Sequence, residues 1–200
     1  MEAELFGDGA RRIAGVDEVG RGPLAGPVTV AAVILDPAAT PDGIQDSKML
    51  TPLRREKIYD AIIESAEVSI AHASVEEIDA MNILQASLLA MSRALEGLTP
   101  LPDMALIDGP RLPKVMPCPG RPIVKGDATC LSIAAASIVA KVTRDKIMRD
   151  LAQHYPGYGW ETNAGYGSKS HIAALLKLGA SPHHRRSFKP VHNILYQEKS

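Results

Sequence analysis

The sequence predicts an α/β fold, because apolar, β-branched segments typical of strands come first and segments with helix signals separate the later strands. Residues 12–19 and 27–35 are two strand-like segments joined through a glycine-rich turn, and Val68, Ile70 and His72 alternate in a third. We expect these first three strands to form a meander. The pattern by itself indicates only a mixed α/β class.

Helix signals occupy much of the remaining chain. Pro52 stands at a first helical position, and the segment from Ser74 to Glu77 has the spacing of a capping box before an apolar helical periodicity. The alanine- and serine-rich run over residues 129–154 has small side chains that permit close packing on a sheet, and a Pro-Gly pair ends it. We expect this run to be the central helix, with a last helix near residues 170–178.

Four acidic residues lie within or at the ends of apolar segments. Asp17 and Glu18 are adjacent in the first strand, Asp108 stops a short apolar run, and Asp127 opens the predicted central helix, where it can serve as the N-cap. A buried, unpaired carboxylate is costly, so each needs water, hydrogen bonds or a cation. Because ligands gather beyond strand ends in open α/β sheets, we expect the four carboxylates to converge. The alternative for the first pair is a solvated hairpin turn.

Converging carboxylates repel one another unless a cation neutralises them. Hard oxygen ligands select magnesium or manganese, and magnesium completes its coordination with water and phosphate oxygens. This predicts phosphoryl chemistry, in which two ions hold the attacking and leaving oxygens of an in-line displacement. The acids by themselves do not specify the substrate.

A glycine-flanked arginine follows the acidic pair. Gly20 and Gly22 can adopt backbone angles closed to other residues and let a ligand approach the main chain, while Arg21 and free amides offer donors to an anion. The glycine spacing differs from a dinucleotide-binding fingerprint, and a strand rather than a helix follows. Lys48 either holds a phosphate as a point charge or caps the loop before the next helix.

Five ordered motifs run along the chain. They are Ala14-Gly-Val-Asp-Glu-Val-Gly-Arg-Gly-Pro23 with Leu24-Ala-Gly-Pro27, Asp46-Ser-Lys48, Ile107-Asp-Gly109, Lys125-Gly-Asp127 with residues 133–142 and Arg144-Asp145, and Gly165-Tyr-Gly167 with His171. On these motifs the chain resembles bacterial ribonuclease HII, the type 2 ribonuclease H family, over almost its whole length. The resemblance implies a ribonuclease H-like fold, a mixed central sheet flanked by helices.

The same resemblance implies an activity and its metal ligands. Members of the family are metal-dependent endonucleases that cut the RNA strand of RNA/DNA hybrids and nick duplex DNA on the 5′ side of an embedded ribonucleotide. Such cleavage serves ribonucleotide excision repair and RNA primer removal, and it leaves 5′-phosphate and 3′-hydroxyl ends. The family's four acids correspond to Asp17, Glu18, Asp108 and Asp127, which implies that these residues hold two Mg²⁺ or Mn²⁺ ions during catalysis.

Further family positions imply substrate contacts. The turn Gly20–Gly22 would contact the 2′-hydroxyl side of the RNA-to-DNA junction, and Tyr166 would sense the following deoxyribose, against which its ring can pack. Lys48 would hold a backbone phosphate near the metals. Ser168 stands where the family usually has Thr, and it keeps the hydroxyl. Without the motif, Tyr166 would be interpreted as a loop aromatic that covers the core.

Positive charge is concentrated near the C-terminus. Residues 169–200 hold six Lys and Arg against one acid, whereas residues 1–168 hold sixteen against twenty-two. A basic strip beside an acidic metal centre suits phosphate binding, so we expect Arg185 and Arg186 to contact the nucleic acid. The alternative is a solvated charged tail. The pair His183-His184 is more typical of a phosphate-contacting loop than of a zinc site, because no cysteine accompanies it.

The composition is that of one enzyme domain. The 200 residues are 46% apolar, so we expect a single catalytic domain over residues 1–200, of which about 170–200 form a small basic helical or extended appendage. No apolar run is long enough to span a membrane, and the N-terminus lacks a signal peptide, so we expect a cytoplasmic monomer without an obligate protein partner. Cys118 and Cys130 are expected to be reduced.

Other functions fit less of the sequence. Ribonuclease HIII has an extra N-terminal domain and a Glu as its fourth acid, whereas only sixteen residues precede Asp17 here and the fourth acid is Asp127. A DNA junction resolvase would lack the ribose-reading motif. A non-catalytic hybrid- or RNA-binding protein, whose acids hold a structural cation, would bind substrate without forming product.

Overall fold

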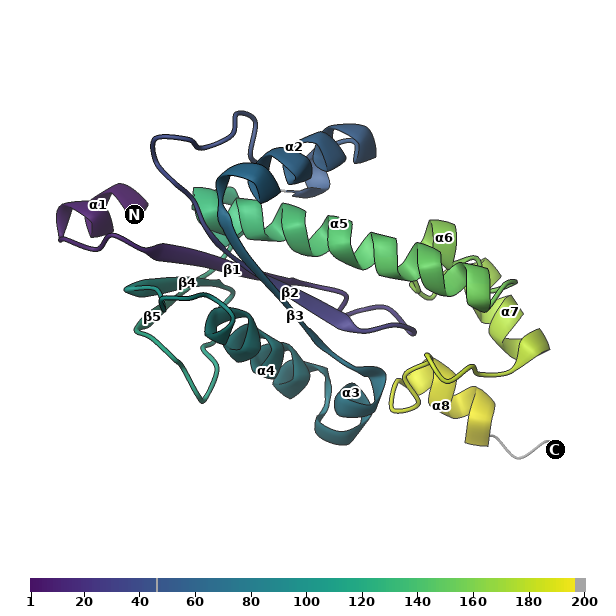
Figure 1. Cartoon of the computed structure of the whole chain (residues 1–200). Coiled ribbons are helices and arrows are strands. Elements are labelled where there is room, and N and C mark those ends of the chain that lie inside the picture. The colour runs from purple at the N-terminus through teal and green to yellow at the C-terminus, as the bar shows by residue number, and fades with distance from the viewer. Residues whose placement is uncertain (46, 197–200) are drawn as a thin grey trace.

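The centre of the structure is a mixed five-stranded sheet of order β3-β2-β1-β4-β5 (Figure 1). The structure is a computed structural model that describes residues 1–45 and 47–196, with only the backbone of Lys48. The strands β1 (Ile13–Val19), β2 (Val28–Ile34) and β3 (Glu67–Ala73) are antiparallel neighbours. The strands β4 (Met104–Asp108) and β5 (Gly120–Ile123) run parallel to β1. The predicted α/β class and the meander of the first three strands are confirmed.

Helices cover both faces of the sheet. The helix α5 (Leu131–His154) packs on one face with α2 (Pro52–Ser65) beside it, and α4 (Ile83–Glu96) packs on the other face (Figure 1). Successive side chains of a strand point to opposite faces, so a strand covered on both sides has to be apolar at every position. All seven residues of β2 are buried, and Val30 packs on the α4 side while Ala31 packs on the α5 side.

The helix predicted after Ser74 is two helices, α3 (Val75–Met81) and α4. The capping box at Ser74 is present, but Asn82 interrupts the helix with a positive φ of 72°. The Asn82 side-chain oxygen then accepts hydrogen bonds from two backbone N–H groups in the first turn of α4. Because the apolar periodicity continues across Asn82, the sequence pattern did not reveal the break between α3 and α4.

The central helix begins later than predicted, and Asp127 is not its N-cap. Asp127 lies in a short 3-10 helix, Gly126–Ala128, and the N-cap of α5 is Cys130, which makes no capping bond with its side chain. Instead, the carboxylate of Glu2, in the N-terminal helix α1 (Glu2–Gly7), accepts the first two backbone N–H groups of α5 at 2.9 and 2.8 Å. A carboxylate at this end satisfies free N–H groups and interacts favourably with the helix dipole.

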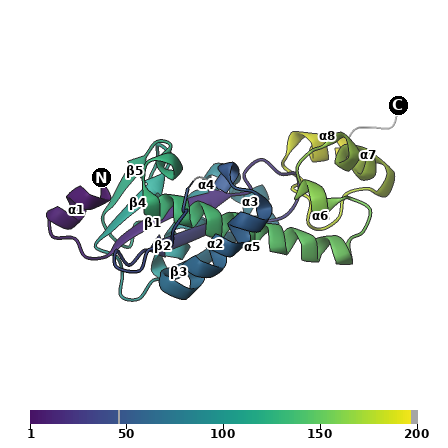
Figure 2. The same ribbon diagram turned by 90° about the horizontal axis from the view of Figure 1, so that it is seen from above.

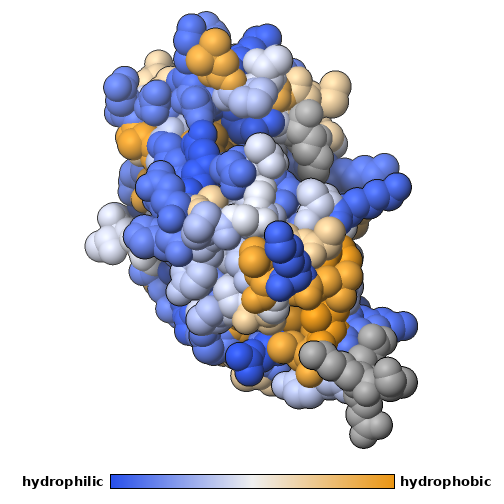
Figure 3. Space-filling view, turned by 90° about the vertical axis from the view of Figure 1, so that its right-hand side faces the viewer, coloured by the Kyte–Doolittle hydropathy of each residue, from blue (hydrophilic) through white to orange (hydrophobic). Residues whose placement is uncertain are grey.

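The C-terminal unit, residues 155–196, surrounds the far end of α5. It contains α6 (Trp160–Asn163), α7 (Lys169–Leu178) and α8 (Lys189–Tyr196), which lie away from β5 (Figure 2). Leu24 and Ala25, which follow the glycine-flanked arginine, are buried in the same apolar cluster as Trp160 and Leu175. Hydrophilic residues predominate on the face that this end presents, and the apolar residues form one large area and a few smaller ones (Figure 3). The glycine-rich turn is therefore packed against the C-terminal unit.

The structure also bears on the expectations for membrane-spanning helices and for the two cysteines. Among the described residues, no helix combines the length and apolar character needed to cross a membrane. Both cysteines, Cys118 and Cys130, are free, as predicted.

The helix α5 approaches β1 closely at Gly15. A Cβ atom built there would lie 2.1 Å from the carbonyl carbon of Ser132, a distance that backbone atoms cannot tolerate. This contact fixes the position of α5 relative to the strand that contains Asp17 and Glu18.

We expect Gly15→Ala to lower the free energy of unfolding by about 3 kcal/mol, because the added methyl group forces α5 away from β1. Urea denaturation followed by circular dichroism measures the change. Gly7→Ala is the matched control, since a Cβ at Gly7 has no neighbour within 4 Å. Equal denaturation midpoints for the two variants would show that α5 moves at no cost and would contradict the tight contact.

Candidate active site

The structure brings the four predicted acids to one cavity. Asp17 and Glu18 lie near the end of β1, Asp108 ends the parallel neighbour β4, and Asp127 follows β5. Because parallel strands have their carboxyl ends at the same edge of a sheet, these side chains become neighbours. All four line a cavity of about 290 Å³, together with Tyr166 and with Ser47, Arg55, Ser137 and Lys141.

Asp17 is the most buried of the four acids, with 7% of its surface exposed. One of its carboxylate oxygens accepts a hydrogen bond from the Glu18 backbone N–H at 2.7 Å. Burial raises the pKa of Asp17 well above its usual value, because it disfavours the charged form, and the charges of Glu18 and Asp108 raise it further. The position is electrostatically costly.

Glu18 has one paired and one unpaired oxygen. The Arg21 guanidinium donates to Oε1 at 3.2 Å, whereas Oε2 is buried and has no hydrogen-bond partner among the described residues. Burial raises the pKa of Glu18, and the positive charge of Arg21 opposes that rise. Through Arg21, the glycine-rich turn is bonded directly to one of the acids.

Asp108 is tied to the turn that contains Asp127. Its Oδ1 accepts a hydrogen bond from the backbone N–H of Gly126 at 2.7 Å. Burial raises the pKa of Asp108, the Gly126 N–H opposes this effect, and the nearby charge of Asp127 adds to it. The hydrogen bond fixes the end of β4 relative to the residues that follow β5.

The set of donors fits a hard divalent cation. Four carboxylates line one cavity, and the buried Oε2 of Glu18 lacks the partner that an ion would provide. Over residues 1–45 and 47–196, no three His, Cys, Asp or Glu side chains already form a finished ion site.

The glycine-flanked turn faces Tyr166 across a narrow gap. A Cβ built at Gly22 would lie 3.5 Å from a ring carbon of Tyr166, whose side chain is 46% exposed. Gly20 has a φ of +95°, and a Cβ there would lie 2.1 Å from Nε of Arg144, so this position requires glycine. The turn and the tyrosine, predicted to act on the same part of the substrate, lie together beside the acids.

The expected phosphate contact of Arg185 is wrong, because Arg185 is fully buried. Its guanidinium donates to the carbonyl oxygens of Gly20 at 2.5 Å, Arg21 at 3.0 Å and Gly26 at 3.0 Å. Burial lowers the pKa of Arg185 to about 9, so the side chain stays charged at neutral pH. His184 is also fully buried, so the predicted phosphate contact fails for the side chains of His184 and Arg185, and for the partly exposed His183 it stays a prediction.

The other residues predicted to contact the substrate lie in different environments. Arg186 is exposed, and its backbone N–H donates to Asp79 at 2.9 Å. Ser168 is the N-cap of α7, where its hydroxyl accepts the backbone N–H of His171 at 3.2 Å. Substrate contacts of Arg186 and Ser168 stay predictions. The side chain of Lys48 lies outside the described residues.

Sequence analysis missed the residues that support the cavity. Ser137 and Lys141 lie one helical turn apart on α5, where Ser137 bonds the hydroxyl of Ser47 at 2.7 Å and Lys141 pairs with Asp145 at 2.7 Å. The helical period places residues four apart on one face, so the spacing of Ser137 and Lys141 was an available signal. Ser47 belongs to the same motif as Lys48, and only the lysine of that motif was predicted to have a role.

Comparison with known proteins gives one family. The family model described as Ribonuclease HII matches residues 14–191. The ribonuclease HII of Roseobacter denitrificans is 65% identical over 192 residues, which are 96% of this chain and 97% of that protein. The ribonuclease HII of Cereibacter sphaeroides strain ATCC 17029 is 67% identical over 199 residues, with coverages of 100% and 94%.

Solved structures agree with the fold. Ribonuclease H2 from Pyrococcus horikoshii superposes with a TM-score of 0.76 at 28% identity, covering 92% of this chain and 97% of that one. Ribonuclease HII of Archaeoglobus fulgidus, solved in a complex with PCNA, gives 0.71 at 27% identity, with coverages of 84% and 88%. Bst-RNase HIII, solved with Mn²⁺, gives 0.77 at 20% identity, with coverages of 94% and 70%, and supports the fold alone.

We expect Asp17→Asn to raise the free energy of unfolding at pH 7, measured in chelator, by about 1–2 kcal/mol, because the variant removes a buried charge. Because the pKa of Asp17 is higher in the folded protein than in the unfolded chain, the unfolded chain loses the Asp17 proton at a lower pH. The wild type therefore loses stability as pH rises from the usual 3.8 toward the raised value. The gain should therefore shrink as pH falls through that window and vanish below it.

Asp103→Asn is the control for this experiment. The Asp103 carboxylate accepts two backbone N–H groups, from Arg11 and Arg12, and these bonds lower its pKa. This variant should gain no stability at pH 7. If Asp17→Asn were no more stable than the wild type across the pH range, the charge of Asp17 would not be a cost to the fold.

Proposed function

Because the chain belongs to the ribonuclease HII family, we propose that it nicks duplex DNA on the 5′ side of a single embedded ribonucleotide, leaving 5′-phosphate and 3′-hydroxyl ends. It is a ribonuclease H, and the family supports endonucleolytic hydrolysis of the RNA strand of RNA/DNA hybrids. Recognition of one ribonucleotide within DNA, and a role in ribonucleotide excision and primer removal, are the finer parts of the proposal.

One observation carries the proposal. The same cavity is lined by four carboxylates, which suit phosphodiester hydrolysis, and by Tyr166, which faces Gly22 of the turn. A site that reads a sugar and a site that cuts the adjacent phosphate have to be neighbours. Their shared cavity supports the assignment of both to one reaction.

We assign Asp17, Glu18, Asp108 and Asp127 to hold two divalent cations, with Mg²⁺ or Mn²⁺ favoured by their oxygen donors. When bound, such ions supply an activated water and stabilise the leaving oxygen. The chain itself provides closely spaced, desolvated carboxylates whose mutual repulsion an ion relieves. Lys141, which also lines the cavity, adds a positive charge near a phosphate.

The turn and Tyr166 suit discrimination between sugars. Main-chain groups at Gly20–Gly22 and the Arg21 guanidinium can hydrogen-bond a 2′-hydroxyl, which only a ribose has. The tyrosine ring presents an apolar face to the next sugar and leaves no partner for a second 2′-hydroxyl. Because Arg21 also bonds Glu18, the sugar reader is linked to the acids by one side chain.

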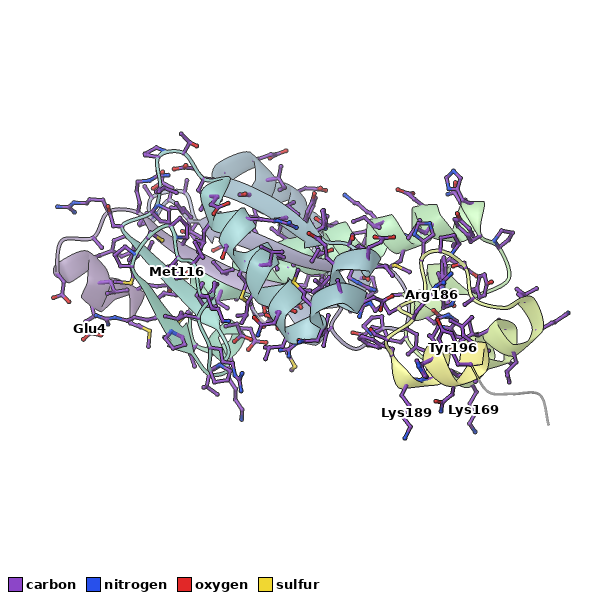
Figure 4. The ribbon with its side chains drawn as sticks, turned by 90° about the horizontal axis from the view of Figure 1, so that it is seen from below. Glu4, Met116, Lys169, Arg186, Lys189 and Tyr196 are labelled. Atoms are coloured by element: carbon purple, nitrogen blue, oxygen red, sulfur yellow. The ribbon has the colours of Figure 1, made fainter. Side chains whose placement is uncertain are left out.

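Exposed basic side chains of the C-terminal unit are the proposed grip on the duplex. Lys169, Arg186 and Lys189 are exposed, and Lys169 and Lys189 project from the same side of this unit (Figure 4). Since Leu24 packs into the same cluster as Trp160, we propose that the appendage and the sheet act as one catalytic domain. The Archaeoglobus fulgidus relative was solved with PCNA, whereas we propose that this chain acts as a monomer without an obligate protein partner.

A cleavage assay tests this function. The protein is incubated with a DNA duplex that contains one ribonucleotide, with a continuous RNA/DNA hybrid and with an all-DNA duplex, in Mg²⁺, in Mn²⁺ and in chelator. Metal-dependent nicking on the 5′ side of the ribonucleotide, with the all-DNA duplex intact, is expected. Cleavage of all three duplexes would indicate a general nuclease, and binding without product would indicate a cation-stabilised binding protein.

We expect Asp127→Asn to abolish turnover while leaving hybrid affinity within about threefold of the wild type, since the loss of a metal ligand removes catalysis rather than phosphate contacts. Single-turnover cleavage and fluorescence anisotropy measure the two properties. Asp150→Asn, an exposed position on α5, is the control and should cleave normally. Full activity of Asp127→Asn would remove this residue from the ligand set.

We expect Tyr166→Ala to lower the preference for the single-ribonucleotide duplex over the continuous hybrid by about tenfold, which corresponds to 1.4 kcal/mol. The measured quantity is the ratio of the kcat/KM values for the two substrates, the junction-to-hybrid ratio. Tyr166→Phe separates the ring from the hydroxyl and should keep most of the ratio if packing dominates. An unchanged ratio in Tyr166→Ala would end the sugar-reading role.

A further inference from the structure

Two fully buried arginines hold the main chain of the glycine-rich turn. Besides the three bonds from Arg185, Arg144 of α5 donates to the carbonyl oxygens of Pro27 at 3.0 Å, Ala25 at 3.0 Å and Ala164 at 2.8 Å. An arginine presents five donors in a rigid fork, so each side chain can fix several carbonyl groups at once. The turn is thus held from the interior, and its outer side stays free for a ligand.

A second chain of bonds leads from the same C-terminal segment to the Tyr166 loop. The backbone N–H of Ser181 donates to His184 Nδ1 at 3.0 Å, so the neutral His184 ring has its proton on Nε2. That nitrogen lies 3.1 Å from His171 Nε2, which also accepts the indole N–H of Trp160 at 3.0 Å, and His171 Nδ1 donates to the Tyr166 carbonyl oxygen at 2.8 Å. A carbonyl oxygen only accepts, which fixes the tautomer of His171.

Backbone contacts place this segment between the two loops. The Arg185 N–H donates to the Leu24 carbonyl at 2.8 Å, and the Gly26 N–H donates to the His183 carbonyl at 2.9 Å. The Leu24 N–H in turn donates to the Gly165 carbonyl at 2.8 Å, next to Tyr166. Residues 181–185, the turn and the Tyr166 loop therefore form one hydrogen-bonded unit.

We propose that residues 181–185 are a specificity-determining positioning element: Arg185 holds the Gly20–Gly22 turn, His184 acting through His171 holds the Tyr166 loop, and together they set the gap between the two. This inference rests on the proposed function, in which the turn and Tyr166 read adjacent sugars. Neither Arg185 nor His184 touches the substrate, because both are fully buried. They act through the groups that they hold.

The width of the gap makes such positioning consequential. A Cβ built at Gly22 would lie 3.5 Å from the Tyr166 ring, an ordinary contact distance, so the gap between the glycine and the ring has room for little more than a methyl group. A misplacement of about 1 Å can cost about a hundredfold in rate when it separates groups that act together. Loosening either support should therefore reduce the choice between substrates more than it reduces substrate binding.

Arg185→Lys is the main test, because it keeps the positive charge and removes the fork that spans three carbonyls. We expect the junction-to-hybrid ratio to fall about tenfold, a fraction of the loss that misplacement can cause. Val191→Ala is the matched control, since Val191 is fully buried in the same unit but bonds neither loop through its side chain. It should lower the melting temperature and leave the ratio unchanged.

The salt dependence of binding separates positioning from direct contact. Each lost phosphate contact lowers the slope of log affinity against log salt concentration by about one. Arg185→Lys should keep the wild-type slope, because it keeps its charge and lies away from phosphates, and Arg185→Gln should keep it too. Arg186→Ala, which removes an exposed charge, is the contrasting variant and should lower the slope.

A milder variant covers the case in which Arg185→Lys does not fold. Ser181→Ala removes the hydroxyl that lies 2.9 Å from His184 Nδ1 and accepts the His183 backbone N–H at 3.2 Å, and it keeps the Ser181 N–H bond to His184. Its junction-to-hybrid ratio should fall about twofold to threefold, as expected for the loss of weak neutral hydrogen bonds. A folded Arg185→Lys or Ser181→Ala with the wild-type ratio, or a Val191→Ala with an equally reduced ratio, would overturn the inference.

The wild-type protein distinguishes the failure of this inference from the failure of the proposed function. If the wild type itself shows no preference for ribonucleotide-containing duplexes, the proposed function is wrong. If the wild type discriminates and the folded variants discriminate equally well, only the positioning role of residues 181–185 is wrong. A reduced salt slope in Arg185→Gln would instead return Arg185 to a direct phosphate contact.

Discussion

The burial of negative charge at the end of β1 is the constraint on which the rest of this structure depends. Asp17 lies in the interior beside Glu18 and Asp108, and burial raises the pKa of all three. A strand can hold carboxylates in that position only if apolar packing compensates for the cost, and β1 and β2 are buried under helices on both faces. The close contact of Gly15 with α5 belongs to the same arrangement, because it brings Ser137 and Lys141 to the acids.

A second constraint is the shape of the turn that follows these acids. Main-chain carbonyl groups that face the interior need hydrogen-bond donors. Arg144 donates to the carbonyl oxygens of residues 25 and 27, and Arg185 donates to those of residues 20, 21 and 26. Buried guanidinium groups are costly, yet both are satisfied by carbonyl oxygens. The sheet and the C-terminal unit therefore meet at this turn. Because of this contact, the acids are held in a fixed position relative to the groups that read the sugar.

The sequence was sufficient where information is local. Apolar runs predicted each end of β1 and β2 to within one residue, and the position of each acid at a strand end predicted their common cavity. The sequence was not sufficient where the partner is distant along the chain. Glu2 caps α5 although more than a hundred residues separate them, whereas the sequence had predicted a cap at Asp127. The burial of Arg185 was equally hidden, because its partners are backbone carbonyls that no side-chain pattern reveals. A charged residue in a basic segment is normally exposed, and that expectation misassigned it.

Mn²⁺ binding measured by electron paramagnetic resonance tests most directly whether Asp17, Glu18, Asp108 and Asp127 form a divalent-cation site. The free-ion signal is followed during titration of the wild type and of Asp108→Asn, without nucleic acid. We expect the wild type to remove Mn²⁺ from solution and the Kd to rise about tenfold or more in the variant, equivalent to at least about 1.4 kcal/mol. Equal affinity in the two proteins, or no uptake by the wild type, would contradict the assignment of this site.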